Sequence, residues 1–207
     1  RMETANEYEK IWWAQGRKAI IGMDEAGRGP IAGPLVVAAV MFPCAYRHAQ
    51  IYDSKKLSEK KRKELFREII QDALEYHIAI ITPQVIDTLN IYRATQKAME
   101  DLSKQFRCKD GILTDAMPLP NCPYEVIPLV KGDQKSVSIA AASILAKVIR
   151  DGIMRAYDIQ YPQYGFAKHK GYPTQAHIEA LHHYGVLDIY RRSYGPVAEM
   201  DQLQLDL

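Results

Sequence analysis

The first third of the chain alternates apolar stretches with short polar and glycine-rich breaks, a pattern typical of strands. An apolar segment, Lys18–Asp24, leads into a turn rich in glycine and proline, Ala26–Pro34. The β-branched run Leu35–Phe42 follows this turn. The order predicts a hairpin or two adjacent strands joined by the glycine-rich turn.

Helical spacing dominates the middle of the chain. From Ser58 to Tyr76 the apolar residues recur every three or four positions, which predicts an amphipathic helix. Shorter patterns predict two more helices, Pro83–Leu89 and Ile91–Phe106, and three strands, His77–Ile81, Gly111–Asp115 and Tyr124–Val130. Strands interleaved with helices indicate the α/β class.

An alanine-rich stretch after Asp133 and through Tyr157 predicts the most buried helix, because Ala140–Ala142 allow another element to approach its backbone closely. A further helix is expected near Thr174–Tyr184.

The 207 residues predict a single compact domain, without internal repeats or a linker. We expect its core at about 18–160, a C-terminal segment at about 161–198 and a tail at 199–207. Apolar residues make up 47% and charged residues 25%, which excludes a disordered chain. Three cysteines without a CxxC pair support neither a disulfide framework nor a cysteine zinc site. The N-terminus lacks the apolar core of a secretory signal, and the expected location is cytoplasmic.

Four acidic residues lie at the ends of predicted elements: Asp24, Glu25, Asp115 and Asp133. Clustered carboxylates supply the oxygen ligands that Mg²⁺ or Mn²⁺ requires, and two such ions can stabilise the attacking and leaving oxygens of a phosphodiester. Neighbouring strand residues point to opposite faces, so Asp24 and Glu25 serve one site only if the strand ends or distorts there. The alternative is that each acid is simply solvated or caps a helix.

The glycines of Gly27–Gly33 form GxGxxxG and not the dinucleotide fingerprint, and Pro30 stands where the helix of that motif would begin. Glycines here allow close approach of the backbone, so that amides donate to a phosphate or sugar hydroxyl while Arg28 adds charge. A purely structural turn is the alternative.

At these residues the sequence resembles a known family. The stretch IGMDEAGRGPIAGP, residues 21–34, resembles the opening motif of bacterial ribonuclease HII. The resemblance continues through DSKKLS at 53–58, KGDQK at 131–135, AASILAK at 141–147 and KHKGYPT at 168–174. It spans roughly Ile20 to Val197.

The resemblance implies a ribonuclease H-like fold, with a mixed central sheet flanked by helices and a helical C-terminal segment. It implies that Asp24, Glu25, Asp115 and Asp133 bind two Mg²⁺ or Mn²⁺ ions and carry the catalysis. The implied activity is endonucleolytic cleavage of RNA in RNA–DNA hybrids and of single ribonucleotides in duplex DNA, leaving 5′-phosphate and 3′-hydroxyl ends. The implied substrate-binding residues are Gly27, Arg28, Gly29, Lys55, Lys168, Lys170 and Tyr172, with Tyr172 packing on the sugar at the junction with DNA.

The chain departs from the family pattern at two places. Thr114 and Ala116 flank Asp115 where the family usually has an aliphatic residue and glycine. Tyr190 stands where a histidine is frequent.

Two patches of basic residues are compatible with nucleic acid. The first lies between Lys55 and Lys63, and a solvated helix face is its alternative. The second interleaves basic with aromatic residues: Lys168, His169, Lys170, Arg191 and Arg192 with Tyr161, Tyr164, Phe166, Tyr172 and Tyr194. The spacing of His177, His182 and His183 matches no common zinc motif, so we expect surface or packing roles.

Two other functions compete with the nuclease. A non-catalytic hybrid-binding module would use only the basic and aromatic C-terminal segment. A small nucleotide-dependent α/β enzyme would use the glycine turn.

Leucines alternate with polar residues over the tail, Gln202–Leu207. A buried strand would explain this alternation, and so would an extended peptide that docks in a partner. The tail resembles the glutamine-leucine peptides with which bacterial replication and repair proteins bind the DNA sliding clamp. A packed or frayed terminus is the alternative.

Overall fold

The computed structural model describes residues 5–206, which divide into two compact units. The described part of the first unit comprises residues 5–26, 36–79 and 95–148. The second comprises residues 27–35, 80–94 and 149–206. Leu207, the last residue of the expected tail peptide, lies outside the described residues.

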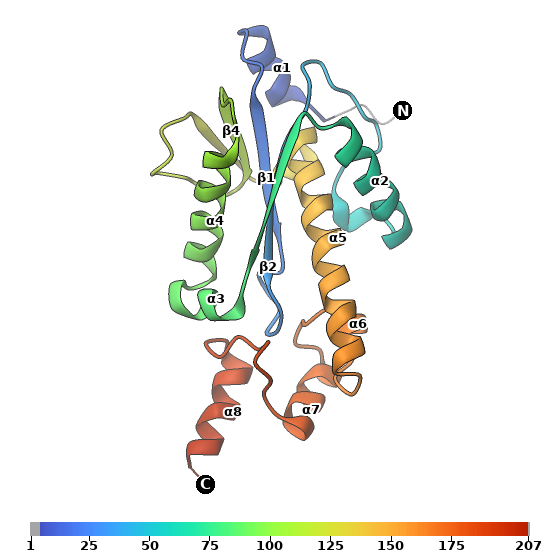
Figure 1. The fold of residues 1–207 in the computed structure, drawn as a ribbon, viewed down its shortest axis with the longest axis vertical. Coiled ribbons are helices and arrows are strands. Elements are labelled where there is room, and N and C mark those ends of the chain that lie inside the picture. The colour runs from blue at the N-terminus through green and yellow to red at the C-terminus, as the bar shows by residue number, and fades with distance from the viewer. Residues whose placement is uncertain (1–4, 207) are drawn as a thin grey trace. The chain divides into compact units, whose positions relative to one another are not determined.

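A five-stranded mixed sheet has the order β3-β2-β1-β4-β5 (Figure 1). Its strands are β1 (Ile20–Ala26), β2 (Leu35–Met41), β3 (Glu75–Ile81), β4 (Gly111–Asp115) and β5 (Val126–Leu129). β1 pairs antiparallel with β2 and parallel with β4, and β4 pairs parallel with β5. The predicted hairpin and the mixed sheet are confirmed.

The helices are α1 (Glu7–Ala14), α2 (Glu59–Asp72), α3 (Pro83–Leu89), α4 (Ile91–Gln105), α5 (Val137–Gln160), α6 (Phe166–His169), α7 (Gln175–Tyr184) and α8 (Gly195–Leu205). Two short 3₁₀ helices, η1 (Ser54–Lys56) and η2 (Gly132–Gln134), precede α2 and α5. The helix predicted from Ser58 to Tyr76 ends earlier in the structure. The helix stops at Asp72 because Ala73 is extended and the Leu74 amide donates to the Met41 carbonyl, so the chain is already entering the sheet. Among residues 5–206 no helix is long and apolar enough to cross a membrane.

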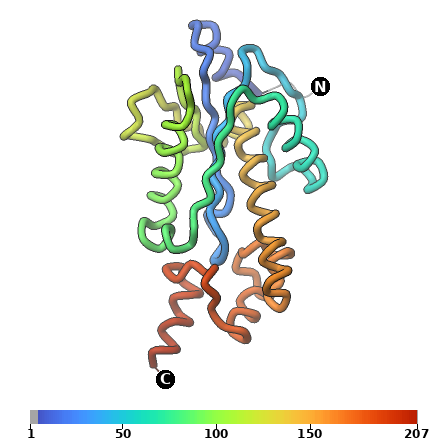
Figure 2. The backbone as a smooth tube through the Cα atoms, in the orientation of Figure 1, coloured from blue at the N-terminus to red at the C-terminus, as the bar shows by residue number. Residues whose placement is uncertain are grey.

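The first turns of α5 lie directly against β1 (Figures 1 and 2). A Cβ added to Gly22 of β1 would lie only 2.3 Å from the carbonyl carbon of Ser138. Ala140–Ala142 are fully buried, as predicted for this helix. The close approach therefore needs a strand residue without a side chain as well as small residues on the helix.

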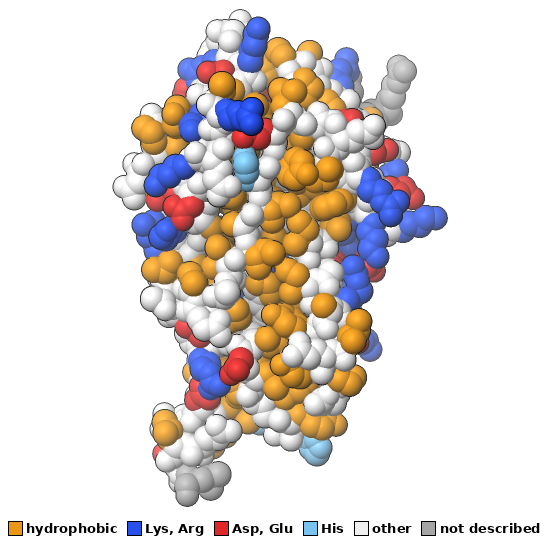
Figure 3. Space-filling model, in the orientation of Figure 1, with side chains coloured by type: hydrophobic (Ala, Val, Ile, Leu, Met, Phe, Trp, Pro, Cys, Tyr) orange, Lys and Arg blue, Asp and Glu red, His pale blue; other side chains and the backbone are white. Residues whose placement is uncertain are grey.

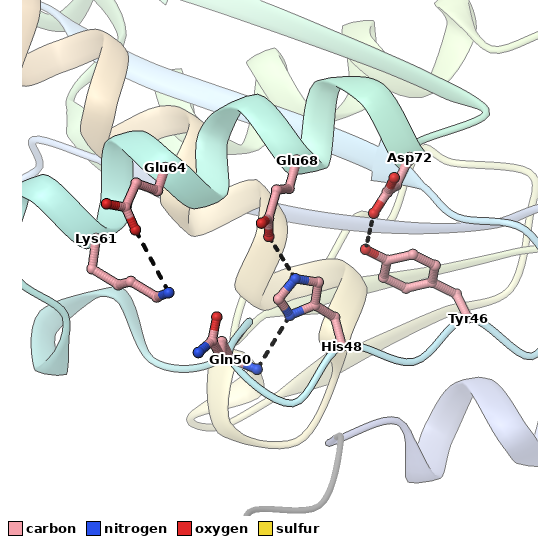
Figure 4. A network of polar contacts seen from close by, with 7 residues as sticks. All are labelled: Tyr46, His48, Gln50, Lys61, Glu64, Glu68 and Asp72. Atoms are coloured by element: carbon pink, nitrogen blue, oxygen red, sulfur yellow. Dashed lines mark hydrogen bonds and ion pairs between the residues drawn. The ribbon is translucent and has the colours of Figure 1, made fainter.

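The segment that leads to η1 is attached to α2 by polar contacts (Figure 4). The Tyr46 hydroxyl donates to Asp72 at 2.7 Å, and Nε2 of His48 lies 2.6 Å from a carboxylate oxygen of Glu68. Nδ1 of His48 accepts from the Gln50 amide at 3.2 Å, so Nε2 carries the proton that Glu68 accepts. Burial and the hydrogen bond to Asp72 raise the pKa of Tyr46 above its ordinary value. These contacts fix the path of the chain that leads to Asp53 and Lys55.

The second unit has its own apolar core. Ile31 and Ala32 of the glycine-rich turn pack there with Met154 of α5 and with residues of α6, α7 and α8. An isolated bridge joins Ala32 to Tyr190. The turn is thus held by the C-terminal segment.

We expect Gly22→Ala to lower the free energy of unfolding by about 1–3 kcal/mol, because the new methyl group overlaps the α5 backbone. Gly195→Ala is the control, since a Cβ there meets nothing within 4 Å. Urea denaturation monitored by circular dichroism measures both, and equal stability of the two variants would contradict the close approach.

Candidate active site

The parallel register of β1 and β4 brings two of the predicted acids to the same end of the sheet. Met23 is the partner of Thr114, so the next residues, Asp24 of β1 and Asp115 at the end of β4, lie beside each other on neighbouring strands. A carboxylate oxygen of Asp115 accepts a hydrogen bond from the Gly132 amide at 2.9 Å, which holds η2 and its buried residue Asp133 beside the strand ends. The structure therefore gathers residues that lie up to 109 positions apart in the chain (133 − 24).

From the sequence, Asp24 and Glu25 serve one site only if their strand ends or distorts there. In the structure, β1 does not end at Asp24. The ladder continues through Asp24↔Ala38, Glu25↔Val37 and Ala26↔Val36. Regular strand geometry directs the side chains of Asp24 and Glu25 to opposite faces of the sheet. Among residues 5–206, no three acidic, histidine or cysteine side chains are grouped closely enough to hold one metal ion.

The acids nevertheless interact strongly. Burial raises the pKa of Asp24 well above its ordinary value, and repulsion from Glu25, Asp115 and Asp133 raises it further, against a hydrogen bond from the Glu25 amide. Burial and then Asp53 and Asp115 raise the pKa of Asp133 to about 6, while Lys55 opposes the shift. The site therefore carries more negative charge than its surroundings neutralise.

This set of donors fits a divalent cation. Mg²⁺ keeps several water ligands and is held by one or two carboxylates together with phosphate oxygens of the substrate. A site that offers carboxylates singly or in pairs meets that requirement without a cluster of three. A bound cation would also relieve the repulsion that raises the pKa of Asp24.

Asp53 is a fifth acid at this site, which the sequence analysis did not identify as a site residue. It is buried, accepts from the Lys55 amide at 3.0 Å and accepts from Nε2 of Gln134 at 3.2 Å. It thereby links η1, which presents the exposed Lys55, to η2, which carries Asp133. The sequence signal that could have identified Asp53 is its position as the first residue of the DSKKLS motif.

The two unusual neighbours of Asp115 have a structural explanation. Thr114 is fully buried, and its hydroxyl donates to the Met117 carbonyl at 2.5 Å and accepts from the Met117 amide at 3.2 Å. These bonds close a tight turn in which Ala116 has φ of 55°, in the left-handed region that favours glycine. Glycine is the residue that the family usually has at this position, and Thr114 holds the turn closed around the strained alanine.

The glycine-arginine turn lies in the second unit together with Lys168, Lys170 and Tyr172, whereas Lys55 lies in the first unit. Arg28 and Gly29 are exposed, and a Cβ on Gly29 would lie 3.2 Å from the ring of Tyr172. Tyr172 keeps 43% of its surface exposed. Lys168 is exposed and Lys170 is half-buried. The unit therefore presents a tyrosine ring beside a glycine backbone.

The second basic and aromatic patch lies on the surface only in part, so the sequence interpretation is wrong for four of its residues. Tyr164, Phe166, His169 and Arg191 are buried. The rings of Tyr164 and Phe166 stack on each other, with centroids 5.4 Å apart. These aromatic side chains therefore form the core of the unit instead of stacking on bases.

His169 and His177 stack at 3.8 Å and are held by hydrogen bonds. His169 accepts from the Gly171 amide and faces the Tyr164 carbonyl, so its proton is on Nε2. His177 faces the Tyr172 carbonyl with Nδ1 and the Tyr190 hydroxyl with Nε2, so Nδ1 donates. Burial lowers the pKa of His177 to about 4. The packing role expected for His177 is confirmed, while His182 and His183 are exposed on α7.

Lysine and arginine side chains gather along α2 (Figure 3). Lys61 pairs with Glu64 and Lys63 with Glu59, and Arg62 donates to the carbonyls of Ser54 and Leu57. These contacts favour a solvated helix face over a dedicated phosphate site for this part of the first patch.

The family model for ribonuclease HII matches residues 21–196. The chain belongs to the ribonuclease HII family. The ribonuclease HII of Francisella tularensis subsp. tularensis (strain WY96-3418) is 53% identical over 182 residues, which are 86% of this chain and 96% of that protein. Among solved structures, ribonuclease H2 from Pyrococcus horikoshii OT3 superposes with a TM-score of 0.77 at 27% identity, over 91% of this chain and 99% of that one. The PCNA:RNase HII complex from Archaeoglobus fulgidus superposes with a TM-score of 0.71 at 24% identity, covering 84% and 92%.

The expected ribonuclease H-like fold is confirmed by these structures. As a member of this family, the protein is a type 2 ribonuclease H, an endonucleolytic hydrolase that acts on RNA in RNA–DNA hybrids. The non-catalytic hybrid-binding module and the nucleotide-dependent enzyme are thereby set aside.

We expect Ala116→Gly to raise the free energy of unfolding by about 0.5–1 kcal/mol, because glycine adopts the left-handed conformation without strain. The matched control is Ala198→Gly in α8, an ordinary helical position where glycine lowers stability by about 1 kcal/mol. Opposite signs in urea denaturation support the strain at Ala116, and the same sign for both variants would refute it.

Proposed function

We propose that Asp24, Glu25, Asp115 and Asp133 bind Mg²⁺ or Mn²⁺ beside the phosphodiester bond that is cleaved. Cleavage leaves 5′-phosphate and 3′-hydroxyl termini. The observation that carries the proposal is the position of Asp24 and Asp115 beside each other on β1 and β4, with Asp133 held near them by the hydrogen bond from the Gly132 amide to Asp115. When bound, the ions would activate a water molecule and stabilise the departing 3′-oxygen.

The residues of the chain have separable roles in this proposal. Asp24 and Asp115, fixed beside each other on adjacent strands, orient the donor set, and Asp133 adds a carboxylate from η2. Asp53 orients Lys55 through its main-chain amide, so that the ammonium group can meet a substrate phosphate. Because the backbone and not a mobile loop positions Asp24, the site is preorganised.

Recognition of the ribonucleotide is assigned to the second unit. Gly27, Arg28 and Gly29 would donate main-chain amides to the phosphate and the 2′-hydroxyl, the group that distinguishes RNA from DNA. Tyr172 would pack on the sugar at the junction, with Lys168 and Lys170 near the flanking backbone. This set would serve both single embedded ribonucleotides and longer hybrids.

We expect Asp24→Asn or Asp133→Asn to abolish cleavage of a duplex with one ribonucleotide in Mg²⁺, because a neutral amide is a poor ligand for a divalent cation. The folded-state pKa of both acids is raised, so their ionised forms destabilise the fold. This penalty shrinks as the pH falls through the raised values and vanishes below the ordinary aspartate pKa of about 3.9. Stability of the variants should therefore be unchanged or higher at pH 7.

Asp101→Asn is the matched control, since Asp101 is exposed and forms an ion pair with Lys97 on the same helix. Gel assays of cleavage and thermal melts are run on all three variants. Near-normal activity of folded Asp24→Asn in Mg²⁺ would contradict the proposed mechanism.

Tyr172→Ala should reduce cleavage at single ribonucleotides more than it reduces duplex binding, with a loss of about 1–3 kcal/mol in transition-state stabilisation. Tyr184→Ala is the control, because this tyrosine is also exposed on the second unit. Binding is measured by anisotropy in chelator and cleavage in Mg²⁺. Equal losses in both would make Tyr172 an affinity residue only.

We also propose, on the resemblance of the tail, that Gln202–Leu207 binds a DNA sliding clamp. The buried strand considered from the sequence is wrong, because α8 continues to Leu205. Leu203 and Leu205 are 56% and 81% exposed, so the end of the helix offers apolar side chains that nothing in residues 5–206 covers fully. The last turn must unwind if the peptide docks in extended form, and helix ends fray readily.

Deleting residues 202–207 should abolish binding to a bacterial sliding clamp, measured by calorimetry, while cleavage of free duplex persists. Ile159→Ser, which removes another exposed apolar side chain, should keep clamp binding. A truncated protein that melts several degrees lower, or an intact one without clamp binding, favours a packed or frayed terminus.

A further inference from the structure

Two arginines are buried beneath the glycine-arginine turn. Arg150 is 2% exposed and Arg191 is fully buried. A guanidinium group is costly to remove from water unless its N–H groups find acceptors. In this unit the acceptors are main-chain carbonyls of the turn itself.

The hydrogen bonds follow the turn from one end to the other. Arg191 donates to the carbonyls of Gly27 at 2.7 Å, Arg28 at 3.1 Å and Gly33 at 3.0 Å. Arg150 donates to those of Ala32 at 3.0 Å and Pro34 at 2.9 Å, and to that of Lys170 at 2.7 Å. The Tyr194 hydroxyl adds a donor to the Arg28 carbonyl at 2.6 Å and accepts from Arg191 at 3.1 Å. Five carbonyls of the turn thus point towards the two cations.

The direction of these carbonyls fixes the direction of the amides. Residues 5–206 contain no cis peptide bond, and in a trans peptide the C=O and the following N–H point in opposite directions. The amides of Arg28 and Gly29 share their peptides with the carbonyls of Gly27 and Arg28. They are therefore directed away from the guanidinium groups, on a stretch of backbone that is exposed.

The close fit also explains why Gly27 must be glycine. Its φ is 95°, and a Cβ would lie 2.1 Å from Nε of Arg150. No side chain fits between this backbone and the guanidinium group.

The two charges are not fully neutralised by their surroundings. Burial lowers the pKa of Arg150 to about 10, and repulsion from Arg191 is the next cause, whereas Tyr172, Asp151 and Tyr194 have weaker opposing effects. Burial likewise lowers the pKa of Arg191, against Tyr194, Tyr172 and Asp87. Both groups remain charged at neutral pH, and they repel each other inside one small unit.

We propose that Arg150 and Arg191 are positioning residues for the substrate, which orient the amides of Arg28 and Gly29 towards a phosphate of the nucleic acid and strengthen its binding with their buried charge. The carbonyl dipoles lie with their negative ends on the cations and their N–H ends outward, so the positive potential is directed to the anion. This inference rests on the proposed binding of substrate at the glycine-arginine turn.

The test compares Arg191→Gln and Arg150→Gln, which remove the charge, with Arg191→Lys, which keeps it but loses most of the hydrogen bonds. Arg107→Gln is the control, because it removes one positive charge from an exposed position. Affinity for a duplex with a single ribonucleotide is measured by fluorescence anisotropy in chelator, and folding by circular dichroism. We expect the two buried glutamine variants to bind about tenfold more weakly than the control, and Arg191→Lys to lose less.

The pH dependence of the affinity of Arg191→Lys separates an electrostatic role of this residue from a purely structural one. Burial lowers the pKa of a lysine from its ordinary value near 10.4, so the affinity of Arg191→Lys should fall as the pH rises from 7 to 9. Dividing the affinity of Arg191→Lys by that of Arg107→Gln at each pH removes general effects of pH on the duplex and on the protein surface. This titration decides the question if the glutamine variants do not fold.

Folded Arg191→Gln that binds as tightly as Arg107→Gln, or an affinity ratio for Arg191→Lys that is independent of pH, would overturn the proposal. Failure of the proposed substrate binding at the turn has a different signature, because Tyr172→Ala, which removes the ring beside Gly29, would then bind and cleave the ribonucleotide duplex as well as Tyr184→Ala does. If only the present inference fails, Tyr172→Ala is impaired and the arginine variants are not.

Discussion

The parallel pairing of β1 with β4 is the constraint on which the site depends. Its register places Asp24 and Asp115 beside each other on neighbouring strands, and the Gly132 amide then fixes Asp133 near them. Carboxylates held this close repel one another when ionised. Burial and then this repulsion raise the pKa of Asp24, and a bound cation would relieve the repulsion. The sheet therefore stores unfavourable electrostatic energy at the position where the chemistry needs an ion.

The same sheet can hold this arrangement only because α5 packs closely against it. Gly22 lets the Ser138 backbone lie directly on β1, and η2 immediately precedes this helix. Glu9 of α1 contributes from outside the sheet, since its carboxylate accepts from the Ser136 hydroxyl at 2.5 Å and the Ser138 amide at 3.1 Å. A carboxylate at a helix N-terminus stabilises the first turn. Asp133 is therefore positioned by a rigid helix start and not by a free loop.

The second unit uses charge differently. Its two buried arginines donate to carbonyls of the glycine-rich turn, and these hydrogen bonds offset part of the cost of burying the charges while they hold the turn in one conformation. The stacked His169 and His177 hold the following segment through neutral imidazoles. One unit thus concentrates negative charge for a cation, and the other concentrates positive charge beneath a backbone suited to a phosphate.

The sequence alone was sufficient for the α/β class, for most strands and helices, and for the family, because hydrophobic periodicity and the DEAGRG motif are local signals. It also singled out the four acids, each at the end of an element. The pairing register, however, depends on contacts between residues distant in the chain, so the continuation of β1 through Ala26 could not be anticipated. The same holds for Arg191 and His169, which read as surface residues from composition but are buried by the packing of the C-terminal helices. Local pattern determines which elements form, whereas burial and direction of a polar side chain are decided only when the elements meet.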